Sequence, residues 1–178
     1  MLIGSIVAIV IIIVVWYIST MNSLRAAELK VDEADSGIDV ALTKRYDVLT
    51  KQLAVVKEYA SHESKTLYET IKLRQGMSMA EKKEAASKMD EVASQIQLTA
   101  EAYPELKSSE NFKMLQNSIT DVEEHLQAAR RLYNANVTSF NTKIVMFPAS
   151  IVANQLALTK RDLFEAEDYK RNDVEMKF

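Results

Sequence analysis

The residues best suited to chemistry in this sequence are two histidines, each of which follows an acidic residue by four positions. Glu58 precedes His62, and Asp121 precedes His125. Positions i and i+4 lie on one face of a helix, so each pair offers two neighbouring metal ligands. A di-metal helical bundle needs two Glu-x-x-His motifs and two further glutamates, and that pattern is absent. Surface ion pairs or hydrogen bonds are therefore the better interpretation, and we expect no metal site.

Other catalytic signatures are also missing from the sequence. There is no Gly-rich phosphate loop and no G-x-S-x-G elbow, and the lack of cysteine excludes disulfides, thiolate chemistry and Cys-based zinc sites. The net charge of −3, from 22 basic and 25 acidic residues, gives no field that would attract nucleic acid. We expect a protein that is not an enzyme, with no catalytic residues, no cofactor and no nucleic-acid partner.

Polar residues beside or within the apolar stripes are the remaining candidates for a site. Buried charges are tolerated when they are paired, and such pairs often fix helix register. We expect a structural polar layer in which Arg130 lies within reach of Asp47, and ligand binding by this layer is the alternative. Its expected members are Asp39, Arg45, Asp47, Arg130, Asn134 and Asn141.

The elements that position these residues should be helices. Three glycines and two prolines in 178 residues are too few for the many tight turns of a sheet protein. The sequence predicts an all-α fold, in which an N-terminal transmembrane helix continues into an elongated antiparallel four-helix, coiled-coil-like bundle.

The N-terminal segment has the length and composition of a membrane span. No charged residue occurs from Met1 to Leu24, and about twenty residues of helix cross the hydrocarbon core. Trp16 and Tyr17 stand where aromatic rings prefer the headgroup level. A cleaved signal peptide is the alternative, but the sequence lacks a basic n-region and a clear cleavage site. Residues 1–23 are thus predicted to be an anchor in the lipid bilayer.

The positive-inside rule gives an orientation for this anchor. No basic residue precedes the apolar run, whereas Arg25, Lys30, Lys44 and Arg45 follow it. The rule predicts a single-pass protein of the cell (inner) membrane, with the N-terminus outside and the bundle in the cytoplasm.

Apolar spacing predicts the boundaries of the bundle, which should occupy residues 24–166. A capping box at Ser78 and Glu81 opens one helix, and Pro104 and Pro148 interrupt the pattern. The predicted helices cover about 24–75, 78–102, 108–147 and 149–166, and a charged tail follows at 167–178.

Three groups of residues form longer motifs along the chain. The first group is Glu33-Ala34, Ile38-Asp39-Val40, Leu42, Arg45-Tyr46-Asp47, Tyr59-Ala60 and His62-Glu63. The second is Glu101 to Lys107 with Asn111-Phe112 and Leu115-Gln116. The third is Ala129-Arg130, Tyr133-Asn134, Val137, Phe140-Asn141, Ile144 and Phe147-Pro148. These groups resemble signatures of the LemA family. The sequence departs from the family pattern at Asp35, where Trp is usual, and near Thr50, where Pro is usual. The resemblance implies an anchored antiparallel helical bundle, and it implies little about biochemical activity.

Two classes of function fit this organisation. The first is a scaffold that self-associates at the membrane and presents its bundle to a protein partner. The second is a sensory or regulatory module that relays a signal between the membrane and a partner, for which no output domain is visible. A regulatory subunit of a membrane enzyme is a third possibility. We favour the scaffold.

Helix lengths favour a homo-oligomer. A first soluble helix of about fifty residues is roughly 75 Å long, whereas the second is only about 38 Å. The apolar residues on the part of the first helix nearest the membrane would then be exposed. They would form an oligomer seam, unless the fourth helix folds back over them. The seam comprises Leu24, Val31, Ala34, Ile38 and Leu42.

Overall fold

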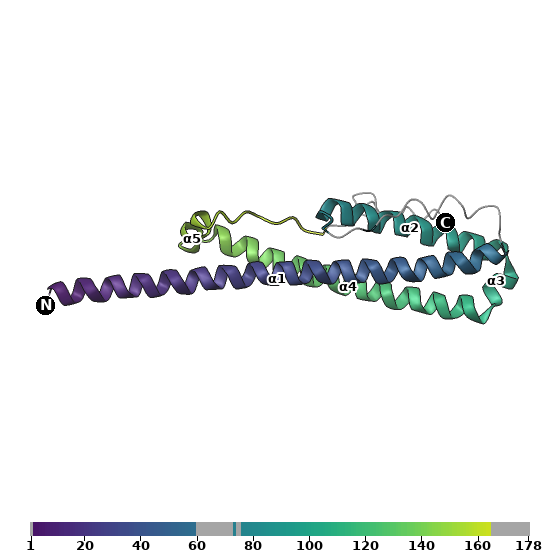
Figure 1. Cartoon of the computed structure of the whole chain (residues 1–178), viewed down its shortest axis with the longest axis horizontal. Coiled ribbons are helices and arrows are strands. Elements are labelled where there is room, and N and C mark those ends of the chain that lie inside the picture. The colour runs from purple at the N-terminus through teal and green to yellow at the C-terminus, as the bar shows by residue number, and fades with distance from the viewer. Residues whose placement is uncertain (1, 60–72, 74–75, 165–178) are drawn as a thin grey trace, which may run out of the picture.

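A single long helix runs through the molecule. The computed structural model describes residues 2–59, 73 and 76–164, and helix α1 extends from Leu2 to Tyr59. At 1.5 Å per residue, its 58 residues span about 87 Å. The first part of α1 extends beyond all the other elements, and the rest is one side of the bundle (Figure 1).

Helix α2 (Met79–Ala102) begins at the predicted capping box, which is confirmed. The Glu81 amide donates to the Ser78 hydroxyl at 3.3 Å, and the Ser78 amide donates to the Glu81 carboxylate at 2.7 Å. Two of the backbone donors at the start of the helix are thereby satisfied. Gly76, just upstream, has a φ of +76°, which favours glycine.

Pro104 separates α2 from two further helices, α3 (Pro104–Ser108) and α4 (Glu110–Val145). Tyr103 has a φ of −122° and a ψ of 89°, outside the helical region that a following proline disfavours, so α2 ends there. The Ser109 hydroxyl accepts from the Phe112 amide at 3.2 Å and caps α4. We expected one helix over 108–147, and α4 is slightly shorter at both ends.

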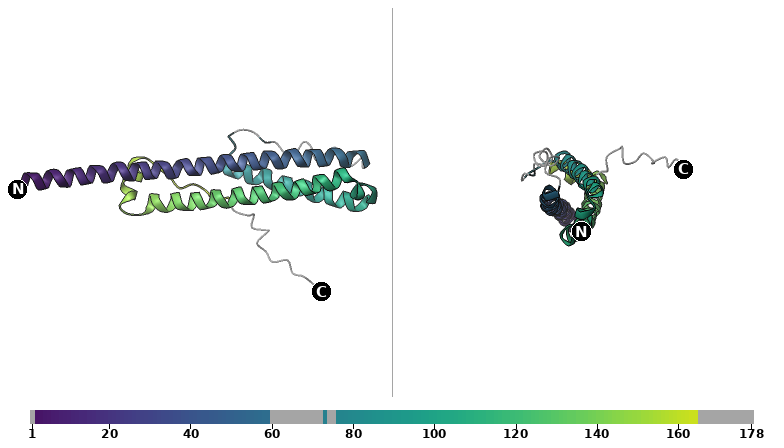
Figure 2. Two further views of the ribbon diagram at one scale, coloured as in Figure 1. Left: turned by 90° about the horizontal axis from the view of Figure 1, so that it is seen from below. Right: turned by 90° about the vertical axis from the view of Figure 1, so that its right-hand side faces the viewer.

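Helix α4 runs antiparallel to α1, and the two lie side by side over most of the length of α4 (Figure 2, left). The Asn136 amide donates to the Lys30 carbonyl at 3.0 Å, and the Lys143 ammonium donates to the Ser23 hydroxyl at 3.2 Å. Seven residues forward on α4 thus correspond to seven residues backward on α1. This register places the end of α4 at the level of residues 20–22 of α1.

The chain after Pro148 differs from the prediction. Helix α5 covers only Ala149–Gln155, so the expected fourth helix over 149–166 is wrong. The Leu158 amide donates to the Ala153 carbonyl at 3.0 Å, and Ala157 has a φ of 52°. This is the usual C-terminal geometry of an α-helix that ends with one residue in the left-handed region. Residues 158–164, which we call the strap, then run back along the bundle without helical structure.

The core is formed by α1 and α4 over their whole shared length, and a third element completes it. Near the α3 end that third element is α2, and near the apolar end of α1 it is the strap with α5 (Figure 1). The all-α fold with a long N-terminal apolar helix packed against other helices is confirmed, and no strand occurs among the described residues.

The five expected seam residues are buried inside one chain. Leu24, Val31, Ala34, Ile38 and Leu42 are between 0% and 4% exposed. The strap covers these residues, because an extended chain advances about 3.3 Å per residue and needs few residues to replace a helix. The chain therefore does fold back over the stripe, in extended form. Two aromatic residues near helix ends are exposed, Tyr103 at 40% and Phe147 at 82%.

Candidate functional site

Layers of polar side chains cross the part of the bundle built by α1, α2 and α4. The first layer contains Lys82 of α2, whose side chain is only 1% exposed. Its ammonium lies 2.8 Å from one carboxylate oxygen of Asp35 and 2.8 Å from one of Asp39, both on α1. Burial by itself lowers the pKa of Lys82, but the two carboxylates outweigh it and hold the pKa above its ordinary value. The lysine is therefore charged and paired inside the bundle.

The second layer contains Arg45 of α1, which is 2% exposed. Its guanidinium forms ion pairs with Asp90 of α2 and Glu123 of α4, and Nη1 donates to the Ala86 carbonyl at 3.1 Å. The Nε of Arg45 contacts Glu123 without the angle of a hydrogen bond. One side chain thus connects all three long helices. Such a planar fork with fixed partners specifies helix register.

The third layer is a chain of glutamines. The Gln52 amide donates to Gln116 at 2.6 Å, and the Gln116 amide donates to Gln97 at 2.8 Å. These residues again come from α1, α4 and α2. Arg45 and Gln52 are seven residues apart on α1, so the second and third layers are about 10.5 Å apart along the helix.

Arg130 does not pair with Asp47, which is exposed on α1 and lies outside the layers. The guanidinium carbon of Arg130 lies 4.5 Å from the centroid of the Phe164 ring, in a cation–π contact. Burial, and next the positive charge of Arg45, lower the pKa of Arg130. Arg130 therefore contacts the last residue of the strap and lies within the electrostatic field of the second layer.

Two asparagines of α4 hold the strap by its backbone. The Asn134 side chain donates to the Phe164 carbonyl at 3.0 Å and accepts from the Phe164 amide at 2.7 Å. The Asn141 side chain makes the same pair of bonds with Arg161, both at 2.9 Å. Seven helical residues rise about 10.5 Å and three extended residues about 10 Å, so the two spacings match. Asn134 and Asn141 therefore replace a neighbouring strand as partners of the strap.

The strap is also joined to other side chains of the bundle. The Tyr133 hydroxyl donates to the Asp162 carbonyl at 2.9 Å. Burial, and next the Asp35 carboxylate, raise the pKa of Tyr133. Arg161 reaches across to Asp32 of α1 at 3.3 Å. A hollow of about 270 Å³ marks the junction at which the strap meets the start of α2.

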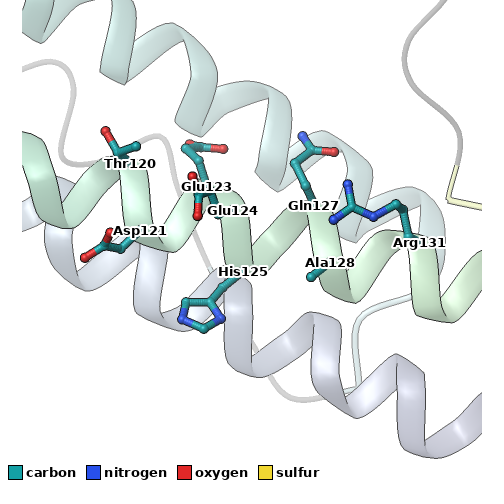
Figure 3. Close-up of a pocket in the computed structure, with 8 residues that line it drawn as sticks. All are labelled: Thr120, Asp121, Glu123, Glu124, His125, Gln127, Ala128 and Arg131. Carbon is teal, nitrogen blue, oxygen red and sulfur yellow. The ribbon is translucent and has the colours of Figure 1, made fainter.

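A second hollow, of about 690 Å³, lies along α4 and includes His125. All eight side chains that line it belong to α4, and they spread along the helix without converging on one point (Figure 3). Among residues 2–59, 73 and 76–164, no group of three His, Cys, Asp or Glu side chains is placed to hold a metal ion. The other predicted pair, Glu58 with His62, cannot be placed because His62 lies outside the described residues.

The first part of α1 is not covered by any other described element over residues 3–16, where every residue is exposed. Its apolar side chains from Ile3 to Ile18 are almost all exposed, and its most apolar 18-residue stretch is long enough to cross a bilayer. None of that stretch is buried, which distinguishes it from the core helix of a water-soluble protein. A signal sequence at the N-terminus has the same composition and length.

Comparison with known proteins agrees with this architecture. The sequence model of the LemA family matches residues 34–178. The chain belongs to the LemA family. It is also 29% identical to Protein LemA of Metamycoplasma hominis over 164 residues. This alignment covers 89% of this chain and 75% of that protein.

The positions that resemble LemA motifs have a structural role here. Arg130, Tyr133, Asn134 and Asn141 all belong to the third motif group, and all four contact the strap. The Tyr103-Pro104 pair of the second group forms the junction between α2 and α3. The LemA resemblance in this region thus coincides with the face that holds the strap.

Four of the six predicted polar residues do take part in structural contacts, and Arg130 does so with a different partner. Asp39 pairs with Lys82, Arg45 is the centre of the second layer, and Asn134 and Asn141 bind the strap. The sequence reasoning missed Lys82 and Gln52, both buried. Gln52 follows Arg45 by one heptad, and that spacing was the available signal.

Proposed function

We propose that this protein is a non-enzymatic scaffold, anchored in the membrane by one helix, that presents a rigid bundle in the cytoplasm. The observation that carries the proposal is the continuity of α1, which runs without a break from its unburied apolar part into the core. A continuous helix transmits position and orientation from the bilayer to the bundle. The polar layers support the same role, because each is paired internally and fixes how the helices meet.

The anchor distinguishes this proposal from a secreted protein with a cleaved leader. We expect the full-length protein to stay in the membrane fraction after alkaline carbonate extraction. Its intact mass, measured from that fraction, should include residues 1–22. A mature chain that begins after the apolar segment would contradict the anchor.

The orientation is proposed from the basic residues that follow the apolar segment. The chain has no cysteine, so a single Met114→Cys substitution, at a side chain that is 64% exposed, gives a specific probe. In intact spheroplasts it should resist an impermeant maleimide, whereas a cysteine in a short polar extension placed ahead of Met1, on the other side of the anchor, should react. The opposite pattern would place the bundle outside the cytoplasm.

A relay of signals is the alternative function, and it requires two conformations of the bundle. We expect a scaffold to show the same hydrogen-exchange protection of α2 and α4 in thin and thick bilayers. Two exchanging populations whose ratio follows bilayer thickness would favour the sensory or regulatory module instead.

Self-association is part of the proposed scaffold, but it does not involve the five predicted seam residues. These are core residues of one chain. Among the described residues, the largest unburied apolar surface is the part of α1 from Ile3 to Ile18, where helices can associate within a bilayer. Light scattering of the full-length protein in detergent tests this, since a monomer at micromolar concentration would contradict self-association.

A further inference from the structure

The turn between α4 and α5 carries an exposed apolar surface that none of the contacts above uses. Val145, Met146, Phe147 and Ile151 are 55%, 58%, 82% and 56% exposed. We call these four residues the tip. The exposure of four neighbouring apolar side chains to water is unfavourable, so we expect the tip to contact a partner.

The tip lies at the level where α1 leaves its apolar part. The Tyr17 hydroxyl donates to Gln155 of α5 at 3.0 Å, and Lys143 contacts Ser23. The antiparallel register of α1 and α4 then puts Phe147 level with about residue 19 of α1. A hydrocarbon core of about 30 Å accommodates about twenty residues of helix, so its boundary falls near residue 22. The tip is therefore placed at that boundary, about 4 Å to the membrane side.

The sequence around the tip has the charge pattern of a segment that touches lipid. From Ile144 to Thr159 there is no charged residue, and lysines stand at both ends, Lys143 and Lys160. Ammonium groups at such positions favour the phosphate level of a bilayer, and the apolar side chains favour the acyl boundary.

The tip is rigidly attached to the bundle. On the inner side of the same turn, Ile144 is 7% exposed, Val152 is not exposed and Ala153 is 1% exposed. The outward-facing side chains are thus held in place by buried neighbours. A preorganised surface of this kind loses little conformational entropy when it inserts.

We propose that the tip inserts into the interface of the bilayer that α1 spans, and so gives the bundle a second membrane contact. The proposal rests on the anchor assigned under the proposed function. Two contacts hold the tilt and rotation of the bundle relative to the bilayer more tightly than the continuous helix does alone. The occupant of the tip is lipid, because the tip lies level with the end of the apolar part of α1 and is apolar itself.

Tryptophan quenching by lipid can test the tip and the anchor separately. Trp16 is the only tryptophan, so the full-length protein in vesicles with lipids brominated near the headgroup reports directly on the anchor. Trp16→Phe combined with Phe147→Trp moves the indole to the tip, and we expect a loss of emission comparable with that of Trp16 and a blue-shifted maximum. Trp16→Phe with Ile151→Trp should behave in the same way. Trp16→Phe with Met114→Trp, at an exposed site near the far end of α4, is the matched control and should keep its emission.

The possible outcomes distinguish the two proposals. Quenched Trp16 with unquenched indoles at positions 147 and 151 would overturn the tip and leave the anchor intact. Unquenched Trp16 with quenching at the tip would contradict the anchor and retain a membrane contact at α5. Equal quenching at the tip and at position 114 would show that the whole bundle lies on the lipid surface, which would overturn a contact specific to the tip.

Discussion

The two halves of the bundle exclude water from the same pair of helices by different chemistry. Far from the apolar end, α2 covers α1 and α4. The layers at Arg45 and Gln52 connect all three helices, and the layer at Lys82 connects α2 to α1. Near the apolar end the strap covers α1 and α4, and Asn134 and Asn141 bind its backbone. A helix satisfies its own backbone and needs only its register fixed, whereas an extended strap needs partners for its backbone groups.

This difference teaches how a bundle can be completed with few residues. The strap covers with seven residues a length of about 23 Å that would take about fifteen residues of helix. The cost is that two amide side chains of α4 must stand one heptad apart and face the strap. The four predictions that follow test this division, starting with a change that should disrupt both halves.

Ile38→Glu should have the largest effect, because Ile38 is fully buried where the two halves meet. The substitution removes an apolar contact worth about 2–5 kcal/mol and also places an unpaired carboxylate in the core. We expect the helical circular dichroism of the bundle to be lost at room temperature or to melt at much lower temperature.

Val40→Glu is the matched control, since Val40 is on the same helix but 54% exposed. Its effect should stay within about 0.5 kcal/mol. If Ile38→Glu instead dissociated an oligomer and left the bundle fully helical, residue 38 would be an intermolecular contact and the core assignment would be wrong.

Arg45→Met should destabilise the half covered by α2 more than the strap half. Loss of one partner of a buried pair costs about 3–5 kcal/mol, but Asp90 and Glu123 are about a third exposed and can be hydrated, so about 2 kcal/mol is expected. Hydrogen exchange should accelerate in α2. Arg131→Met, at an exposed position on α4, controls for the loss of an arginine. Equal acceleration of hydrogen exchange in both halves would mean that the Arg45 layer stabilises the whole bundle and not the α2 half alone.

Asn141→Ala should release the strap and leave α2 unaffected. It removes two hydrogen bonds, each worth about 0.5–1.5 kcal/mol, and exposes the backbone of Arg161. Trypsin should then cleave faster after Lys160 or Arg161. Trypsin should cleave the control variant Asn117→Ala, changed at an exposed asparagine of the same helix, at the wild-type rate. An unchanged rate in Asn141→Ala would show that other contacts suffice to hold the strap.

The sequence indicated where the later helices begin, but neither the early end of α5 nor the strap, for physical reasons. Apolar spacing and capping chemistry are local, so Ser78, Pro104 and Pro148 marked breaks that the structure also shows. The strap depends on side chains 20 to 30 residues away along the chain. The sequence spacing of Leu158, Leu163 and Phe164 does not distinguish a helix from an extended segment. Burial of Lys82 was equally hidden, because its partners Asp35 and Asp39 lie on another helix.

The smallest effect should be an alkaline loss of stability, since Lys82 and Tyr133 both have raised pKa values in the fold. Below about pH 10, at which these groups begin to deprotonate in the unfolded chain, their contribution is complete. Above it the unfolded chain releases protons that the folded chain retains, so stability falls until the folded pKa values are passed. The contribution of these groups to the free energy of unfolding, measured by urea denaturation, should therefore be constant from pH 7 to 9 and fall above about pH 10. Lys82→Met and Tyr133→Phe should each reduce that alkaline slope, whereas Lys113→Met, at an exposed lysine of α4, should leave it unchanged. If all three variants and the wild type shared one slope, the first layer would not couple proton binding to folding.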